Sequence, residues 1–290
     1  MFESMLVFGL VNSATLLLLS LGFSITFGLS GVANFAHGGI YLLSGYLAFF
    51  LIRTIGLPYF IAVILTIIIT AFLGAAIYKL VVIRVRGIVL NEVIATFAIG
   101  ICILELFRWL GYVTYEYSLP YIVRGRFTVL GTTLDYQRLL IVVVALLLAV
   151  FVWYFTHRTK TGMALLGMAQ DEYTALAVGV DSDWAATYSF AIGGAFAAVA
   201  AVMILPLGII NINLGYEVLL IALAVTVLGG LESTKGLILG CFILGYAQVF
   251  TSTFFAPHWK EAVYLLAILI VLAVKPSGLL GKFKELEERV

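Results

Sequence analysis

The sequence predicts an all-α integral membrane protein: a polytopic bundle of about eight to nine transmembrane helices that forms one domain over residues 1–290. Hydrophobic residues make up 63% of the chain and charged residues 11%, whereas a soluble domain carries about 25% charged residues. Stretches without Asp, Glu, Lys or Arg cover residues 6–51, 55–78, 139–156, 184–216 and 236–259. Because about 20 apolar residues cross the hydrocarbon core, these stretches predict membrane spans and exclude a water-soluble globule.

The order of the spans follows from the positions of charges, glycine and proline. Residues 6–51 are too many for one helix, and we expect a break at the glycine-rich stretch 28–31. The run 184–216 is expected to break after Pro206, at Gly208, Asn211, Asn213 and Gly215. Nine segments result: 6–27, 36–52, 58–80, 88–110, 137–156, 184–206, 216–230, 236–254 and 261–274. The seventh and ninth are short, and a re-entrant first or seventh segment would change the count by one.

Basic residues predict the orientation, because cytoplasmic loops retain an excess of Lys and Arg. The larger set, expected in the cytoplasm, is Lys79, Arg84, Arg86, Arg158, Lys160, Lys235, Lys275, Lys282, Lys284 and Arg289. The smaller set, expected outside, is Arg53, Arg108, Arg124, Arg126, Arg138 and Lys260. The C-terminus is therefore expected in the cytoplasm and, with nine crossings, the N-terminus outside. The outward loop 111–136 fits either an interfacial aromatic belt or an external partner through Tyr112, Tyr115, Glu116, Tyr117 and Tyr121.

Motifs for catalysis, metals or nucleotides are absent from the sequence. It has no Gly-x-x-x-x-Gly-Lys-Ser/Thr phosphate loop and no nucleophile elbow. His37, His157 and His258 lie in three regions without metal-ligand spacing, and Cys102 and Cys241 lie inside apolar runs. The net charge of +1 provides no basic surface for nucleic acid. We expect no catalytic residue, no metal, no cofactor and no nucleic-acid partner.

Four ionisable residues fall inside or near the expected spans. Glu105 and Arg108 are three apart on one helical face, which favours a structural ion pair. Glu92 and Glu217 are expected near helix starts, where the helix dipole favours a carboxylate. A proton relay is the weaker interpretation of this set.

A polar, glycine-rich break interrupts the first uncharged run. Irregular backbone at membrane depth is tolerated only where protein buries it or where it lines a water-filled cavity. A helix that starts here would present its N-terminus to a polar substrate group. The predicted substrate path is Ser30, Gly31, Asn34, His37 and Gly38. The competing interpretation is a cytoplasmic turn with Asn34 as the N-cap.

The segment 159–183 is the one sizeable stretch expected in the cytoplasm. Its apolar and polar residues alternate at helical spacing, which predicts one short amphipathic helix over residues 163–178 between Gly162 and Gly179. Because that helix looks too exposed to join the core, we expect it to dock into a groove of a cytoplasmic protein. The alternative is a helix that rests on the lipid surface, although its polar face is acidic. The expected docking residues are Met163, Leu166, Gly167, Ala169, Gln170, Asp171, Ala175 and Gly179.

Three ordered motifs resemble the permease subunits of branched-chain amino acid ABC transporters, the LivH type. The first is GLSGVANFAHG at residues 28–38. The second is GMAQD at 167–171, followed by Ala175, Ala177, Gly179 and Val180, which is similar to the family's cytoplasmic coupling segment. The third is VTVLGGLES at 225–233, followed by Gly236 and Gly240. Met168 departs from a common arginine, and Glu232 and Lys235 replace a usual glycine and proline.

The resemblance implies half of an importer in the inner membrane. The implied partners are a second related permease, two cytoplasmic ABC ATPases that hydrolyse ATP, and an extracytoplasmic solute-binding protein. Branched-chain or related small amino acids are the implied cargo, with urea or short amides as the alternative. Small residues spaced for close helix packing are Gly229, Gly230, Gly236 and Gly240. A rival from another class is a stand-alone channel or secondary carrier, which would leave the segment 163–178 without a partner; a membrane-embedded enzyme finds no support in the motifs.

Overall fold

The computed structural model describes residues 2–112, 117–230 and 233–281. Its longer helices are α1 (Phe2–Ser30), α2 (His37–Phe49), α3 (Tyr59–Ile77), α5 (Val89–Trp109), α6 (Tyr136–Arg158), α7 (Lys160–Gln170), α9 (Ser182–Ile204), α10 (Asn213–Gly229), α11 (Thr234–Phe254) and α12 (Lys260–Val274). Short elements are α4 (Ile83–Val85), α8 (Glu172–Ala177), the π-helical turns η1 (Phe50–Thr54) and η2 (Tyr78–Val82), and the 3-10 turns η3 (Leu205–Leu207) and η4 (Pro257–Trp259). The strands β1 (Arg126–Val129) and β2 (Thr132–Asp135) form an antiparallel hairpin.

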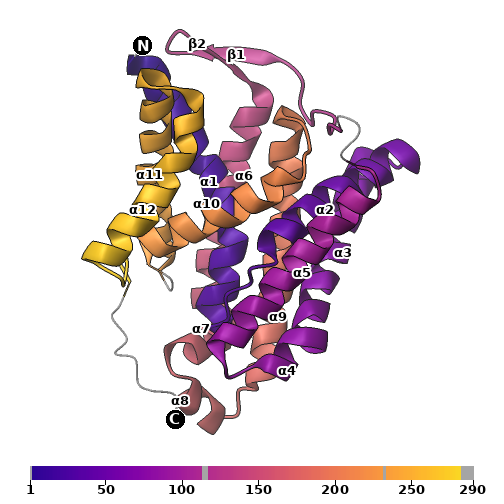
Figure 1. Ribbon diagram of the computed structural model, residues 1–290, viewed down its shortest axis with the longest axis vertical. Coiled ribbons are helices and arrows are strands. Elements are labelled where there is room, and N and C mark those ends of the chain that lie inside the picture. Colours follow the sequence, from indigo (N-terminus) through magenta and orange to yellow (C-terminus); the bar gives the residue numbers. More distant parts are fainter. Residues whose placement is uncertain (1, 113–116, 231–232, 282–290) are drawn as a thin grey trace.

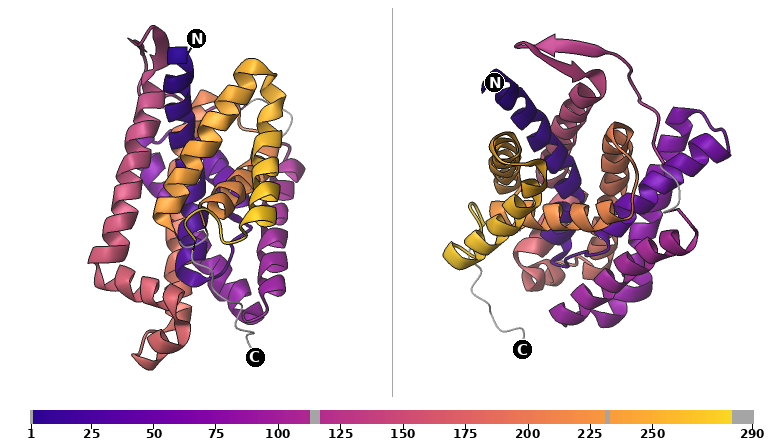
Figure 2. Two further views of the ribbon diagram at one scale, coloured as in Figure 1. Left: turned by 90° about the vertical axis from the view of Figure 1, so that its left-hand side faces the viewer. Right: turned by 45° about the horizontal axis from the view of Figure 1, so that its top comes forward.

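All nine apolar segments predicted from the sequence are helices. Among the described residues, seven helical stretches are long and apolar enough to span a membrane, whereas α10 has 17 residues and α2 has 13. The hairpin lies at one end of the bundle, here called the hairpin end, and α4, α7 and α8 lie at the other, the α8 end (Figure 1). Arg84, Arg158 and Lys160, from the larger basic set, belong to elements at the α8 end. Figure 2 shows the same arrangement from two further directions.

The first predicted break turns the chain back into the bundle. Helix α1 ends at Gly31, whose φ of +69° places it in the left-handed region that favours glycine. The chain then returns along α1, so that Nε2 of His37 lies 2.9 Å from the carbonyl oxygen of Leu19. Leu19 precedes the end of α1 at Ser30 by eleven residues, or about 16 Å at 1.5 Å per residue. Helix α2 therefore begins inside the bundle.

The second predicted break produces the matching feature. After η3 the chain turns, and the N–H of Ile210 donates to the carbonyl of Tyr117 at 2.8 Å. Helix α10 then starts against α2 and crosses the bundle obliquely (Figure 1). A Cβ placed on Gly38 would overlap the carbonyl oxygen of Gly215. The starts of α2 and α10 are thus in backbone contact within the bundle.

The segment 159–183, expected in the cytoplasm, differs from the single helix predicted over 163–178. It forms α7 and α8, because Asp171 leaves the helical region with φ −152° and ψ 100° and caps α8 by accepting the N–H of Thr174 at 3.1 Å. The expectation that this segment is too exposed for the core was also wrong. Leu165, Met168 and Ala175 are buried and belong to the main hydrophobic core.

The loop expected to face outward holds structure that the sequence did not predict. Residues 126–135 form the hairpin, closed by an ion pair between Arg126 Nε and Asp135 Oδ1 at 3.0 Å. The rings of Tyr112 and Tyr117 pack on Tyr46 of α2, with centroids 4.9 and 5.8 Å from its ring. These two tyrosines belong to the packing beneath the loop, whereas residues 115 and 116 lie outside the described residues.

Candidate functional site

The meeting point of α2 and α10 is the centre of the candidate site. Glycines at this point let the two backbones touch, and α5 completes the contact from a third side. A Cβ on Gly39 would lie 2.9 Å from the carbonyl oxygen of Gly100, and one on Gly215 would overlap the side chain of Leu104. Only glycine permits so close an approach of three backbones. Two helix N-termini therefore converge inside the bundle, where the helix dipoles favour a negatively charged group.

Two predicted path residues, Asn34 and His37, lie in the interior at this point. Each is 1% exposed. Oδ1 of Asn34 accepts the N–H of Ala36 at 3.1 Å, and the N-cap of α2 is Ala36 without a side-chain cap, so Asn34 forms a turn before the helix instead of capping it. The ring of His37 contacts Gly22 and the carbonyl of Leu19. Both side chains hold the start of α2 in place, and their contact with a substrate stays a prediction.

The other predicted path residues lie on either side of that turn. Ser30 donates its hydroxyl to the carbonyl of Thr26 at 2.6 Å and accepts the N–H of Val32 at 3.2 Å, which ends α1. Gly31 is exposed, with open space around it. Gly38 is buried against Gly215. Of the five, Gly38 is therefore the residue that joins the two helix starts.

Helix α5 fixes the returning chain by hydrogen bonds. The hydroxyl of Thr96 accepts the N–H of Phe35 at 3.2 Å and lies 3.3 Å from the carbonyl of Ala33. One turn earlier, Glu92 is buried in the first turn of α5 and its Oε1 accepts the N–H of Gly87 at 2.9 Å. This confirms the expected place of Glu92 at a helix start, and the ion pair of Glu105 with Arg108 is present at 3.4 Å. Glu217 lies just beyond the first turn of α10.

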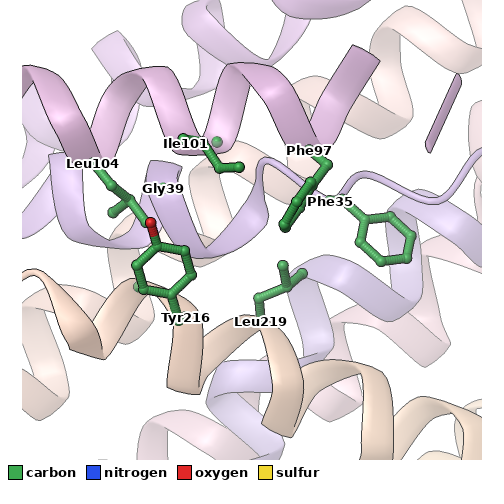
Figure 3. A pocket seen from close by; sticks show the side chains of 9 residues that line it. Phe35, Gly39, Phe97, Ile101, Leu104, Tyr216 and Leu219 are labelled. Carbon is green, nitrogen blue, oxygen red and sulfur yellow. The ribbon is translucent and has the colours of Figure 1, made fainter. Parts of the chain in front are cut away.

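A pocket opens where the three helices meet (Figure 3). Its cavity volume is ≈ 10 Å³, about the room of one water molecule, and its nine lining residues are Phe35, Gly39, Phe97, Gly100, Ile101, Leu104, Gly215, Tyr216 and Leu219. Tyr216 is the one among these nine whose side chain carries a polar atom, and its hydroxyl points to the side of Leu104. The lining is apolar and lies beside two helix N-termini, where a carboxylate is favoured, but a cavity of this size has no room for an amino-acid side chain unless the helices move apart.

Polar side chains on α10 continue from the pocket to the surface of the chain. Asn211 and Asn213 are exposed and Glu217 is partly exposed, although all three follow a break inside the bundle. Polar and ionisable groups at membrane depth face protein or water instead of lipid. This face of α10 is therefore not a lipid surface. These residues mark the predicted break after Pro206 and were not predicted as site residues. Their pattern of polar residues and glycine inside an apolar run matches that of the first break.

The α8 end presents a second surface. Leu165 and Met168 point into the core, whereas Met163, Leu176 and Val178 are exposed. Gly167 faces open space, since a Cβ placed there meets no atom within 4 Å. Leu166, Ala169 and Gln170 lie in the rest of α7, and Asp171 separates α7 from α8. Ala175 is buried, and Gly179 has a φ of +87° after α8. The outward apolar residues lie on two short helices and the turn after them.

The predicted packing glycines lie where α10 meets α11. Cβ atoms on Gly229 and Gly236 would each overlap the other residue's backbone, and Gly240 approaches the carbonyl of Val225. Gly230 has a φ of +103° and lies against Gly281. Residue 232, one of the departures noted above, lies outside the described residues.

Comparison with known proteins identifies the family. The family model described as the permease component of a branched-chain amino acid transport system matches residues 5–272. This chain belongs to that family. The permease protein BraD of the high-affinity branched-chain amino acid transport system of Pseudomonas aeruginosa is 31% identical, over 96% of this chain and 95% of that protein. The corresponding protein LivH of Salmonella typhimurium is 29% identical, over 94% of each chain.

More distant relatives agree with this assignment. A probable LivH permease of Methanocaldococcus jannaschii is 24% identical, over 96% of this chain and 93% of that protein. The solved structure of PsaBC from Streptococcus pneumoniae in complex with Fab is similar with a TM-score of 0.51 at 17% identity, over 94% of this chain and 92% of that chain. That likeness shows the fold alone. The chain is thus a multi-pass membrane permease and a transport subunit.

Proposed function

We propose that this chain forms one half of the translocation path of an ATP-driven importer for branched-chain or related small amino acids. The observation that carries the proposal is the contact between the starts of α2 and α10, beside an apolar pocket and an exposed polar face of α10. The helix N-termini suit the carboxylate of an amino acid, and the apolar lining of the pocket would contact its aliphatic side chain when movement of the helices widens the pocket. The branched-chain cargo is supported by the names of the relatives.

The exposed face of α10 needs a partner within the membrane. Asn213 and Glu217 cannot be left against hydrocarbon without cost, so a second related permease is the expected neighbour, with the path between the two. Ser30, Gly31, Asn34, His37 and Gly38 would support that path by holding the start of α2. In this arrangement cargo meets α10 directly, and the residues of the first break position it.

The exposed apolar residues of the α8 end are proposed to dock on cytoplasmic ABC ATPases. Met163, Leu176 and Val178 would bury their side chains in a groove on an ATPase, one for each permease. ATP hydrolysis would take place on those subunits, and a solute-binding protein would deliver cargo at the hairpin end. This assigns the α8 end and the C-terminus to the cytoplasm of a cell whose inner membrane holds the complex, as the basic residues favour.

Uptake into vesicles tests the proposal. The complex purified with its co-expressed subunits is reconstituted into proteoliposomes, and labelled leucine uptake is measured with ATP and with a non-hydrolysable ATP analogue. We expect uptake only with ATP, and competition by valine and isoleucine but not by urea or acetamide. Uptake without ATP would support a channel or carrier instead, and competition by urea or acetamide would support the alternative cargo.

A further inference from the structure

A polar cluster joins two cytoplasmic loops at the α8 end and is not explained by the path or by docking. Nη1 of Arg86 lies 3.0 Å from the hydroxyl of Tyr78, 2.9 Å from Oγ of Ser182 and 2.8 Å from Oδ1 of Asp183. The hydroxyl of Tyr78 also donates to Oδ1 of Asp183 at 2.8 Å. The cluster therefore connects the start of η2 and the turn after α4 with the first turn of α9.

The partners of Arg86 separate this cluster from an ordinary surface ion pair. A solvent-exposed pair contributes little to stability, and the side chain of Asp183 is 51% exposed. Here the guanidinium side chain is 20% exposed and reaches three oxygens, one of them on Tyr78, a residue with no exposed surface. The ring of Tyr78 packs against Phe190 of α9, with ring centroids 5.4 Å apart. Networks of this kind rigidify the elements they join.

One side of the cluster is the proposed docking segment. Ser182 and Asp183 open α9, directly after α8 and the turn 178–181, and Asp181 caps α9 by accepting the N–H groups of Asp183 and Trp184. A displacement of α7 and α8 by a docked protein therefore reaches Ser182 and Asp183 through a short, capped connection. Within α9, these residues are the first to receive it.

The other side leads to the path. Arg86 is followed by Gly87, whose N–H is held by buried Glu92 of α5 at 2.9 Å. Thr96, one turn further, holds the N–H of Phe35 in the returning chain at 3.2 Å. The hydrogen bonds of Arg86 at the start of α9, the peptide bond from Arg86 to Gly87, and the hydrogen bonds of Glu92 and Thr96 thus connect the start of α9 with the residues before α2.

We propose that Arg86, held by Tyr78 and Asp183, is a positioning residue that transmits the movement of the docking segment to α5 and the path. This rests on the proposed function. In this role Arg86 binds neither the ATPase nor the cargo. It keeps the start of α9 and the start of α5 moving together. Without it, ATP hydrolysis continues while transport per ATP falls.

The test uses Arg86→Gln and Tyr78→Phe in the reconstituted complex. Tyr78→Phe removes one hydroxyl and keeps the ring on Phe190. Arg86→Lys keeps the charge but has one nitrogen in place of the planar fork. Arg84→Gln is the matched control, because Arg84 lies two residues earlier and its guanidinium donates to the carbonyl of Leu80 in its own helical segment. ATPase co-purification, ATP hydrolysis and leucine uptake are measured for each.

We expect Arg86→Gln and Tyr78→Phe to retain the ATPases and to lower leucine uptake per ATP hydrolysed by about fivefold or more, the usual lower range of allosteric coupling. Arg86→Lys should be intermediate and Arg84→Gln unchanged. An unchanged ratio in both test variants overturns the proposal, as does loss of the ATPases from both, which would indicate a docking role. Absence of ATP-driven uptake in the parent complex overturns the proposed function itself, and with it this inference.

Discussion

Substituting alanine for Gly38 tests the contact between α2 and α10. The added Cβ would overlap the carbonyl oxygen of Gly215 and lie 3.1 Å from Cβ of Leu219. Backbone atoms of a packed helix cannot move aside as a side-chain end does, so α2 and α10 must separate. Overpacking of this kind costs about 1–3 kcal/mol. We expect the purified complex to melt at a lower temperature and to lose most of its leucine uptake.

Gly45 of the same helix provides the matched control. A Cβ there meets Cδ1 of Leu205, the end of a flexible side chain, and other atoms lie 3.8 Å away. The rotation of Leu205 is offset by the gain of up to about 1 kcal/mol when alanine replaces glycine inside a helix. Gly45→Ala should therefore melt and transport like the parent. If Gly38→Ala also melts and transports like the parent, the two helix starts do not touch in the working complex.

Three further substitutions address docking, orientation and the first break. Leu166→Asp should free the ATPases while the permease still inserts into the membrane. Leu165→Asp should prevent accumulation of the permease itself, because Leu165 is 0% exposed and a buried unpaired carboxylate costs several kcal/mol. ATPases that stay bound to Leu166→Asp would contradict the docking assignment. With Cys102 replaced by alanine, an impermeant thiol reagent added to intact cells should label Val129→Cys in the hairpin and not Val178→Cys, and the reverse pattern would refute the orientation. His37→Leu should slow uptake with the ATPases retained, because the imidazole contact to Leu19 is lost; normal uptake would remove His37 from the support of the path.

The sequence predicted the helices well and their contacts poorly. Nine apolar segments and both breaks could be located, because span length and glycine or proline positions are local properties. The division of residues 163–178 into two helices could not be predicted, because it depends on how Asp171 caps α8 and on which side of α7 packs against the core. The place of Tyr216 in the pocket could not be predicted either, because it depends on the return of residues 208–212 into the bundle. Nothing in the spacing of Arg86 and Asp183, 97 residues apart, indicated their contact.

Water accessibility along α10 tests the central claim most directly. Single cysteines at Asn213 and, as a control, at exposed apolar Phe72 of α3 are placed in a transport-competent complex that lacks Cys102. A membrane-impermeant thiol reagent is then applied to both sides of proteoliposomes that contain the complex. If the start of α10 lines the path, Asn213→Cys is labelled, excess leucine slows its labelling, and Phe72→Cys stays unlabelled. An unlabelled Asn213→Cys in a complex that still transports leucine would contradict the assignment of the path to α10.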